Sequence, residues 1–355
     1  MAEILALGLT HYPPLCLDDA NMAGILGWTL DDPAIPAAAK DPANWPAAMR
    51  AEWGADRGAT AAAAHRAALV SGFEQLRAAL DAFAPDAVVI FGDDQYENFK
   101  EDVIPAFTVC AYGDLEVRPW AQVKDSGAIG GKPNVWREGP DFGFTLKGRP
   151  DIARQLATGM IEAGIDAAYA YQPLHHPGIA HAFLNAVLFL DYHRQGFPYP
   201  VICVPLNCYG RRVISTRGFL SRFDAPVDPD PPSPSPKRFM EMGAAAARAL
   251  SASPWRIAMI ASSSWSHAFL CDWTWRLRPD TDADRRLYDA LSRSDFALWR
   301  ATTLQQVETA GQHEVLNWFA LMGAVEAIGA PLAWSRFVET HVFNSNKVFA
   351  QWEPA

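Results

Sequence analysis

The sequence predicts an α/β protein with a central mixed sheet flanked by helices. Short apolar runs of strand length recur along the chain, and between them lie longer segments whose apolar residues repeat at helical spacing. Such alternation is typical of a layered α/β domain, and we expect residues 1–355 to form one domain. The expected strands cover residues 3–9, 86–91, 166–171, 200–206, 257–261 and 332–338.

The composition is that of an ordinary globular protein and argues against several functional classes. Half of the 355 residues are hydrophobic, 20% are charged and the net charge is −10. No basic cluster stands out, so nucleic acid is not an expected partner. No apolar run approaches the length of a membrane span, and the first residues lack the features of a signal peptide. The five cysteines contain no CxxC pair, which favours reduced thiols and a cytoplasmic protein.

The first expected strand, residues 3–9, ends in Thr10-His11-Tyr12-Pro13-Pro14. The prolines stop regular structure and hold His11 at the strand end. A lone histidine is more often structural than a ligand, and at this point both roles are open for His11. Residues 17–56 are expected to form short helices and loops. Residues 57–83, which contain His65, predict an alanine-rich helix.

The strand at residues 86–91 runs into Gly92-Asp93-Asp94-Gln95. Two adjacent carboxylates at the carboxyl end of a buried strand are typical of a binding site, because open α/β sheets place ligands there. The alternative is that both aspartates only cap or turn the chain after the strand.

The middle of the chain is less regular. Residues 100–150 predict short strands or a hairpin, which we interpret as an excursion that forms a lid or an oligomer contact. A helix is expected at 151–163, and the strand at 166–171 is followed by Leu174-His175-His176-Pro177-Gly178. The proline-rich residues 225–237 predict an extended connector. It is not expected to be a domain boundary, because strands and helices resume beyond it.

The last part of the chain supplies two further polar sites. The strand at 257–261 ends in small residues that lead to Ser266-His267. Two helices are expected within 282–309. A nearly all-apolar helix then begins near His313, with Glu314 in its first turn. A carboxylate there interacts favourably with the helix dipole, but a buried one also needs a partner, and a metal ion is a suitable one.

The polar residues at these strand ends and helix starts form one set of candidates. Imidazole and carboxylate groups with open positions are the ligands that oxygen-activating non-haem Fe(II) sites use. No nucleophile elbow, phosphate-binding loop or dinucleotide fingerprint competes with this interpretation. The candidates are His11, Asp93, Asp94, Gln95, His175, His176, His267, His313 and Glu314.

In these motifs and their order the sequence resembles the class III extradiol ring-cleavage dioxygenases, the family of the protocatechuate 4,5-dioxygenase β-subunit and the gallate-type dioxygenases. The resemblance covers most of the chain, and four ordered matches carry it. They are Thr10-His11-Tyr12-Pro13 for the first iron ligand, His176 for an active-site histidine, Ser266-His267 for the catalytic acid–base, and Glu314 ahead of Met322-Gly323-Ala324 for the glutamate ligand.

One position departs from the family pattern. The second histidine ligand of the family stands in an Asn-Asp-His context, and Asp94 falls at that position here. Either Asp94 is a ligand, or Gln95 or the more distant His65 takes its place. A carboxylate in place of an imidazole makes the site more anionic and favours a harder metal ion.

The resemblance implies a single catalytic α/β domain that holds Fe(II) by His11, Asp94 (or its substitute) and Glu314. It implies that the enzyme cleaves the ring of a catecholic substrate, carboxylated or lignin-derived, with O2. His267 would move a proton and His176 would hydrogen-bond the substrate. A homodimer is expected. The alternatives are a metal-dependent hydrolase or lyase on the same scaffold, and a non-catalytic partner subunit of a dioxygenase.

Overall fold

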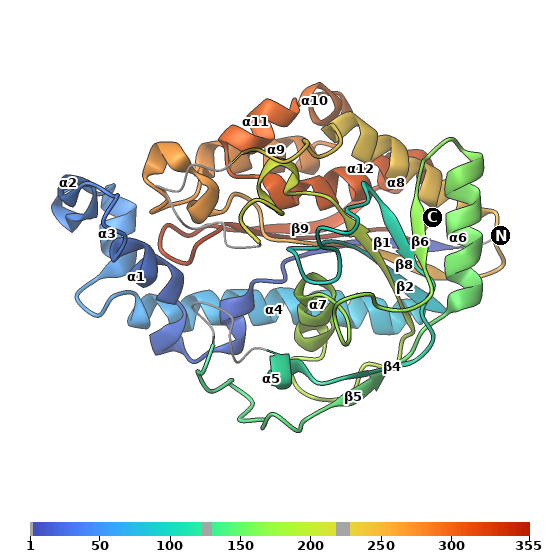
Figure 1. Ribbon diagram of the computed structural model, residues 1–355, viewed down its shortest axis with the longest axis horizontal. Helices are drawn as coiled ribbons and strands as arrows, with labels where there is room; N and C mark the ends of the chain where they lie inside the picture. The colour runs from blue at the N-terminus through green and yellow to red at the C-terminus, as the bar shows by residue number, and fades with distance from the viewer. Residues whose placement is uncertain (1–2, 123–129, 218–227) are drawn as a thin grey trace.

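A mixed sheet lies at the centre of the computed structural model, which describes residues 3–122, 130–217 and 228–355 (Figure 1). Six strands of the described chain form it in the order β7-β2-β8-β1-β10-β9. The strands β7, β2, β8 and β1 are parallel, whereas β10 runs antiparallel to both β1 and β9. Their bounds are β1 Ile4–Leu9, β2 Ala87–Asp93, β7 Val201–Leu206, β8 Ile257–Ser262, β9 Leu332–Val338 and β10 Lys347–Trp352. The predicted α/β class with a mixed sheet is confirmed.

Helices cover both faces of this sheet, which explains why its parallel strands are apolar up to their last residues, Asp93 in β2 and Ser262 in β8. Every residue of the four parallel strands is buried, as expected for strands with helices on both sides. Alternate side chains of β1 and β2 enter two separate cores. One core is closed by α6 (Pro150–Glu162), α8 (Pro236–Ser251) and α12 (Leu316–Ile328). The other is closed by α4 (Ala59–Phe83) and α7 (His181–Leu190), below the sheet in Figure 1.

The remaining elements are short. The helices are α1 Gly24–Leu30, α2 Ala37–Lys40, α3 Ala47–Trp53, α5 Pro119–Gln122, α9 Thr281–Ser292, α10 Phe296–Ala301 and α11 Leu304–Thr309. The 3₁₀ turns are Pro13–Cys16, Asp19–Asn21, Pro42–Asn44, Gly210–Arg212, Ala268–Leu270, Asp272–Thr274 and η8, His313–Val315. Two small ladders lie outside the main sheet, β3 (Thr108–Cys110) with β6 (Ala168–Ala170) and β4 (Leu115–Val117) with β5 (Phe144–Leu146).

The structure corrects three expectations. Residues 166–171 were expected to form a strand of the central sheet. Only Ala168–Ala170 form a strand, β6, and it pairs with β3 in a separate two-stranded sheet. The tail after residue 338 contains a full strand, β10, which had no predicted counterpart. Residues 282–309 lie in three helices, α9 to α11, rather than two. Residues 225–227 of the proline-rich segment lie outside the described residues, and residues 228–235 have no regular structure.

Two glycines let α8 and α12 cross at very short range. A Cβ atom on Gly243 would lie 1.7 Å from the carbonyl oxygen of Ala320, and one on Gly323 would lie 2.0 Å from that of Met240. The backbones therefore touch where any other residue would force the helices apart. This contact fixes α12, and with it the η8 turn that carries Glu314.

The parallel strands all end at the same edge of the sheet. His11 follows β1, Asp93 is the last residue of β2, and the residues up to His267 follow β8. This is the edge at which open α/β sheets bind ligands. In the described part of the chain, no helix is both long and apolar enough to cross a lipid bilayer.

Candidate metal centre

His11 is held at the end of β1 with one ring nitrogen already engaged. The side chain is buried, and its Nδ1 donates a hydrogen bond to the carbonyl oxygen of Ser262, 2.9 Å away. In the neutral ring this leaves the lone pair on Nε2, the arrangement that metal-binding histidines share. Burial lowers the pKa of His11, but Glu314 and Asp93 raise it overall. The two carboxylates beside this ring therefore favour a positive charge between them and His11, carried either by a proton on the ring or by a bound cation.

Glu314 is fully enclosed in the η8 turn, with each carboxylate oxygen facing a different set of groups. Oε1 accepts a hydrogen bond from the Tyr209 hydroxyl and lies 3.3 Å from Nε2 of His267. Oε2 lies 3.3 Å from Nε2 of His11 and has no hydrogen-bond partner among the described residues. Burial alone would raise the pKa of Glu314, but His267 and His11 lower it to about 2. The carboxylate is therefore ionised.

Asp93 brings a second buried carboxylate to the same place. Its Oδ1 accepts a hydrogen bond from the Asn317 side chain at 3.2 Å, whereas Oδ2 has no partner among the residues the structure describes. Burial, with the neighbouring Glu314, raises the pKa of Asp93 to about 7. One ligand atom each of Asp93, His11 and His181 lies within 4.8 Å of the other two.

His181 is the member of the cluster that sequence reasoning missed. It is the first residue of α7, and its ring lies perpendicular to that of His11 with the centroids 5.0 Å apart. Nδ1 lies 2.7 Å from Oε2 of Glu97, and the backbone N–H donates to Oε1 at 3.0 Å. Burial alone would lower the pKa of His181, but Glu97 raises it to about 10. The available signal was its position at the start of the apolar segment at 179–192.

The donor set fits a divalent cation. His11, Asp93, Glu314 and His181 each have an outer atom tied to the protein, and the inner oxygens of both carboxylates are buried without a partner among the described residues. Buried unpaired carboxylate oxygens are costly unless a cation or proton satisfies them. The separation of 3.3 Å between Nε2 of His11 and Oε2 of Glu314 also suits neighbouring ligands of one octahedral ion, which stand roughly 3 Å apart at metal–ligand distances near 2.1 Å.

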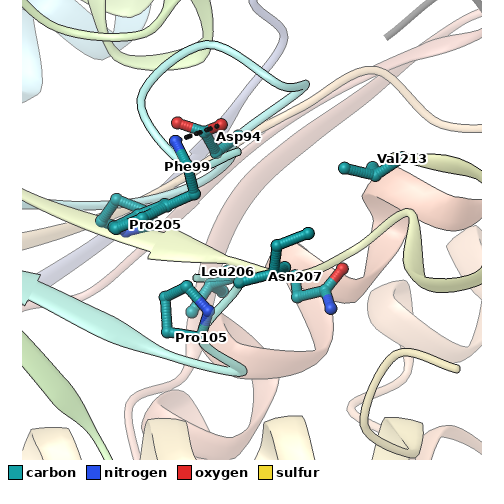
Figure 2. Close-up of a pocket in the computed structure, with 8 residues that line it drawn as sticks. Asp94, Phe99, Pro105, Pro205, Leu206, Asn207 and Val213 are labelled. Carbon is teal, nitrogen blue, oxygen red and sulfur yellow. Dashed lines mark hydrogen bonds between the residues drawn. The ribbon is translucent and has the colours of Figure 1, made fainter. Parts of the chain in front are cut away.

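Asp94 lies outside this cluster and has the loop-capping role that was the alternative to ligation. Its carboxylate accepts the backbone N–H groups of Glu97, Asn98 and Phe99 at 2.9, 2.9 and 3.3 Å. Consecutive side chains at a strand end point to opposite sides, so Asp93 reaches the cluster and Asp94 does not. Asp94 instead lines a small pocket beside Pro205 (Figure 2). With about 10 Å³ of space, this pocket holds roughly one water molecule and no substrate.

The other candidates from the sequence lie around or away from the cluster. His65 is a buried residue of α4 that packs against Tyr12 and Phe343, and burial lowers its pKa well below the usual value. Half-buried His176 accepts a hydrogen bond from the backbone of Gly178 at 3.1 Å and lies near Glu97. Its contact with substrate stays a prediction. Gln95 is half-buried in the loop that follows Asp93, and His175 pairs with Asp102 at the surface.

His267 stands beside the cluster as a buried imidazole. Its backbone N–H donates to the carbonyl of Gly311 at 2.9 Å, and Nε2 faces Oε1 of Glu314. Nδ1 is buried without a hydrogen-bond partner among the described residues. Burial lowers the pKa of His267, although Glu314 opposes this effect. A neutral imidazole in contact with an ionised carboxylate is well suited to accept a proton.

Asp284 of α9 is a fully buried carboxylate that ties the loops of the site together. Its oxygens accept hydrogen bonds from the backbone N–H of Ser266 at 3.0 Å, from Gln312 at 2.7 Å and from Asn346 at 2.8 Å. Ser266 directly precedes His267, and Gln312 lies in the turn that leads into η8. One carboxylate of α9 therefore connects the loop that carries His267, the turn that leads into η8, and the residue that precedes β10.

We expect Asp284→Asn to reduce the pH dependence of the free energy of unfolding. Burial raises the pKa of Asp284 to about 7 in the folded protein, whereas an aspartate in the unfolded chain titrates at ~3.9. Between these two pKa values the folded protein keeps a proton that the unfolded chain has lost. This difference stabilises the folded state at low pH, and the stabilisation is lost as the pH rises to the folded pKa. Urea unfolding at about pH 5 and about pH 7 should show the wild type losing about 2 kcal/mol more than the variant.

The variant can keep the network intact. Oε1 of Gln312 has no hydrogen-bond partner among the described residues, so a flip of its amide offers an acceptor to the NH2 group of the introduced asparagine. An equal loss of stability in both proteins over this pH range would show that Asp284 does not carry the proton.

Three curated proteins are similar in sequence to this chain, and all are named as 2,3-dihydroxyphenylpropionate/2,3-dihydroxicinnamic acid 1,2-dioxygenases. The Pseudomonas putida protein is 31% identical over 133 residues, 37% of this chain and 34% of the relative. The Paraburkholderia xenovorans protein is 27% identical over 191 residues, 54% of this chain and 46% of the relative. The Photorhabdus laumondii protein is 24% identical over 195 residues, 55% of this chain and 47% of the relative.

The chain thus spans between a third and a half of the length of the curated relatives it matches. No protein-family model matches it. The three relatives nevertheless confirm the resemblance to extradiol dioxygenases of the class III type that the ordered motifs predicted.

Proposed function

We propose that this protein is a non-haem Fe(II)-dependent extradiol dioxygenase that cleaves the ring of a catecholic substrate with O2. The observation that carries the proposal is the buried meeting of His11, Asp93 and Glu314, with two unpaired carboxylate oxygens, beside the imidazole of His267. The names of the three relatives support a catechol that bears a carboxylated side chain.

Nε2 of His11, Oε2 of Glu314 and Oδ2 of Asp93 are the atoms that would hold the ion, since the outer atoms of these side chains are tied to Ser262, Tyr209 and Asn317. When bound, Fe(II) would bring the two substrate oxygens and O2 into contact, which is mainly a gain in proximity. Asp93 thus replaces Asp94 in the set of ligands proposed from the sequence.

The protein residues around the ion would orient the substrate and move its proton. His267 can accept a proton from a substrate hydroxyl, because burial lowers its pKa and keeps the ring neutral. The resulting imidazolium would be stabilised by Oε1 of Glu314, 3.3 Å away. Tyr209 fixes Glu314 through its hydroxyl, and the ring of Phe269, 5.2 Å from that of His267, helps to exclude water.

The proposal predicts that protein purified without oxygen binds about one Fe(II) per chain and consumes O2 with 2,3-dihydroxyphenylpropionate or another catechol. An oxygen electrode and the absorbance of the ring-opened product would measure turnover, with iron-free protein as the control. Iron binding with no O2 uptake across a panel of diols would favour a hydrolase or lyase on this scaffold. Absence of any metal, together with co-purification of a second homologous chain, would favour a partner subunit.

A further inference from the structure

We infer that Glu97 positions His181 as the second imidazole ligand of the metal centre, in place of the histidine that the Asp93-Asp94 motif lacks. The inference rests on the proposed function only in assuming that the cluster binds a metal ion. It assigns a ligand from a different element, the start of α7, and a positioning role to a loop residue that no sequence motif singled out.

Asp94 stabilises the loop that follows β2 and carries Glu97. Its carboxylate accepts the backbone N–H groups of Glu97 and of the next two residues. This cap turns the chain sharply after β2. The turn places the Glu97 carboxylate against the N-terminus of α7, and the next residue, Asn98, accepts a hydrogen bond from the backbone N–H of Leu174 at 2.8 Å. The loop after β2 is therefore docked on the segment that leads into α7.

Glu97 makes a double contact with His181. One carboxylate oxygen accepts the backbone N–H at 3.0 Å, and the other lies 2.7 Å from Nδ1 of the ring. The side chains are 22% and 26% exposed, so the pair is largely shielded from water. A carboxylate bound to Nδ1 fixes both the orientation and the tautomer of an imidazole, and leaves Nε2 as the nitrogen that can bind a metal ion.

His181 also lies close enough to His11 and Asp93 to share a metal ion with them. The perpendicular ring of His181 lies 5.0 Å from that of His11, and a ligand atom of His181 is within 4.8 Å of ligand atoms of His11 and Asp93. Two imidazoles with one carboxylate are the set that oxygen-activating non-haem iron sites use. With His181 added to His11, the cluster supplies both imidazoles of that set, and Glu314 and Asp93 supply its carboxylate and one further carboxylate ligand.

The assignment can be tested by metal binding alone. Co(II), which resists oxidation by air, serves as the probe, and its dissociation constant is measured by calorimetry for the wild type, His181→Ala, Glu97→Gln and His175→Ala. We expect His181→Ala to weaken binding by about 100-fold and Glu97→Gln by about 10-fold, as is usual for a ligand and the residue that orients it. His175→Ala, a surface neighbour paired with Asp102, should bind like the wild type.

A measurement on the wild type tests the assignment even if the variants fold poorly. X-ray absorption of the Co(II) protein distinguishes one imidazole ligand from two. Two imidazoles would support the assignment even if the protein consumed no O2, so a failure of the proposed reaction would be separate. One imidazole, or unchanged affinity in a folded His181→Ala protein, would overturn it while leaving the proposed dioxygenase intact. A wild type that binds no Co(II) would overturn both.

Discussion

Replacement of Glu314 by glutamine should abolish tight metal binding. The exchange puts an NH2 group where Oε2 now stands, 3.3 Å from Nε2 of His11, or else deprives the Tyr209 hydroxyl of its acceptor. Loss of an anionic ligand from a buried site also removes charge that the cation needs. We expect the dissociation constant for Fe(II) or Co(II), measured anaerobically by calorimetry, to rise by at least about 100-fold.

Asp94→Asn is the matched control for this experiment, because it also removes one carboxylate charge at the same edge of the sheet. With its oxygen at the Oδ1 position, the asparagine can still accept the backbone N–H groups of Glu97, Asn98 and Phe99, which lie 2.9, 3.3 and 3.3 Å from Oδ1 of Asp94. We expect its metal affinity to stay within about threefold of the wild type. A loss in Asp94→Asn as large as that in Glu314→Gln would restore Asp94 as a ligand.

Replacement of His267 by glutamine should remove most of the proposed dioxygenase activity and leave metal binding unchanged. The glutamine amide can still donate to Oε1 of Glu314, which His267 faces at 3.3 Å, but it cannot accept a proton at neutral pH. Loss of a general base typically costs about 10²- to 10⁴-fold in rate. We expect kcat with a catechol substrate, followed by O2 uptake, to fall within this range, while metal content stays unchanged.

His193→Gln provides the comparison, since His193 is an exposed histidine that pairs with Glu74 on the surface. It should retain wild-type turnover. If His267→Gln lost its metal as well, the role of His267 would be ligation rather than proton transfer.

The sequence predicted most of the architecture, because buried parallel strands and long amphipathic helices leave strong local patterns. The strand β10 had no predicted counterpart. Its sequence, Lys347-Val-Phe-Ala-Gln-Trp, is short and follows a polar segment, and its place between β1 and β9 depends on pairing with residues far along the chain. The strand predicted at residues 166–171 is longer than the observed β6, and it was placed in the wrong sheet. An apolar run indicates a strand but does not indicate which sheet the strand joins.

The sequence placed several polar side chains at one edge of the sheet, and the structure differs from the predicted cluster in two respects, each with a physical cause. Residues at the ends of β1 and β8 and at the start of the apolar helix do converge. The choice between Asp93 and Asp94 depends on the strand phase at its last residue, and a one-residue shift sends the side chain to the other face. His181 was not predicted, because its position in the cluster depends on a contact with Glu97, and no local pattern encodes a contact between two distant loops.

The position of β1 in the sheet has a consequence for how the chain folds. This strand comes near the N-terminus, but both of its neighbours, β8 and β10, belong to the last third of the sequence. Contacts between such distant segments carry a large entropic cost and slow the search for the native state. Until those strands arrive, His11 has no Ser262 carbonyl to orient its ring. The proposed metal site is therefore complete only when nearly the whole chain has folded, so the binding of a metal ion would report a completed sheet.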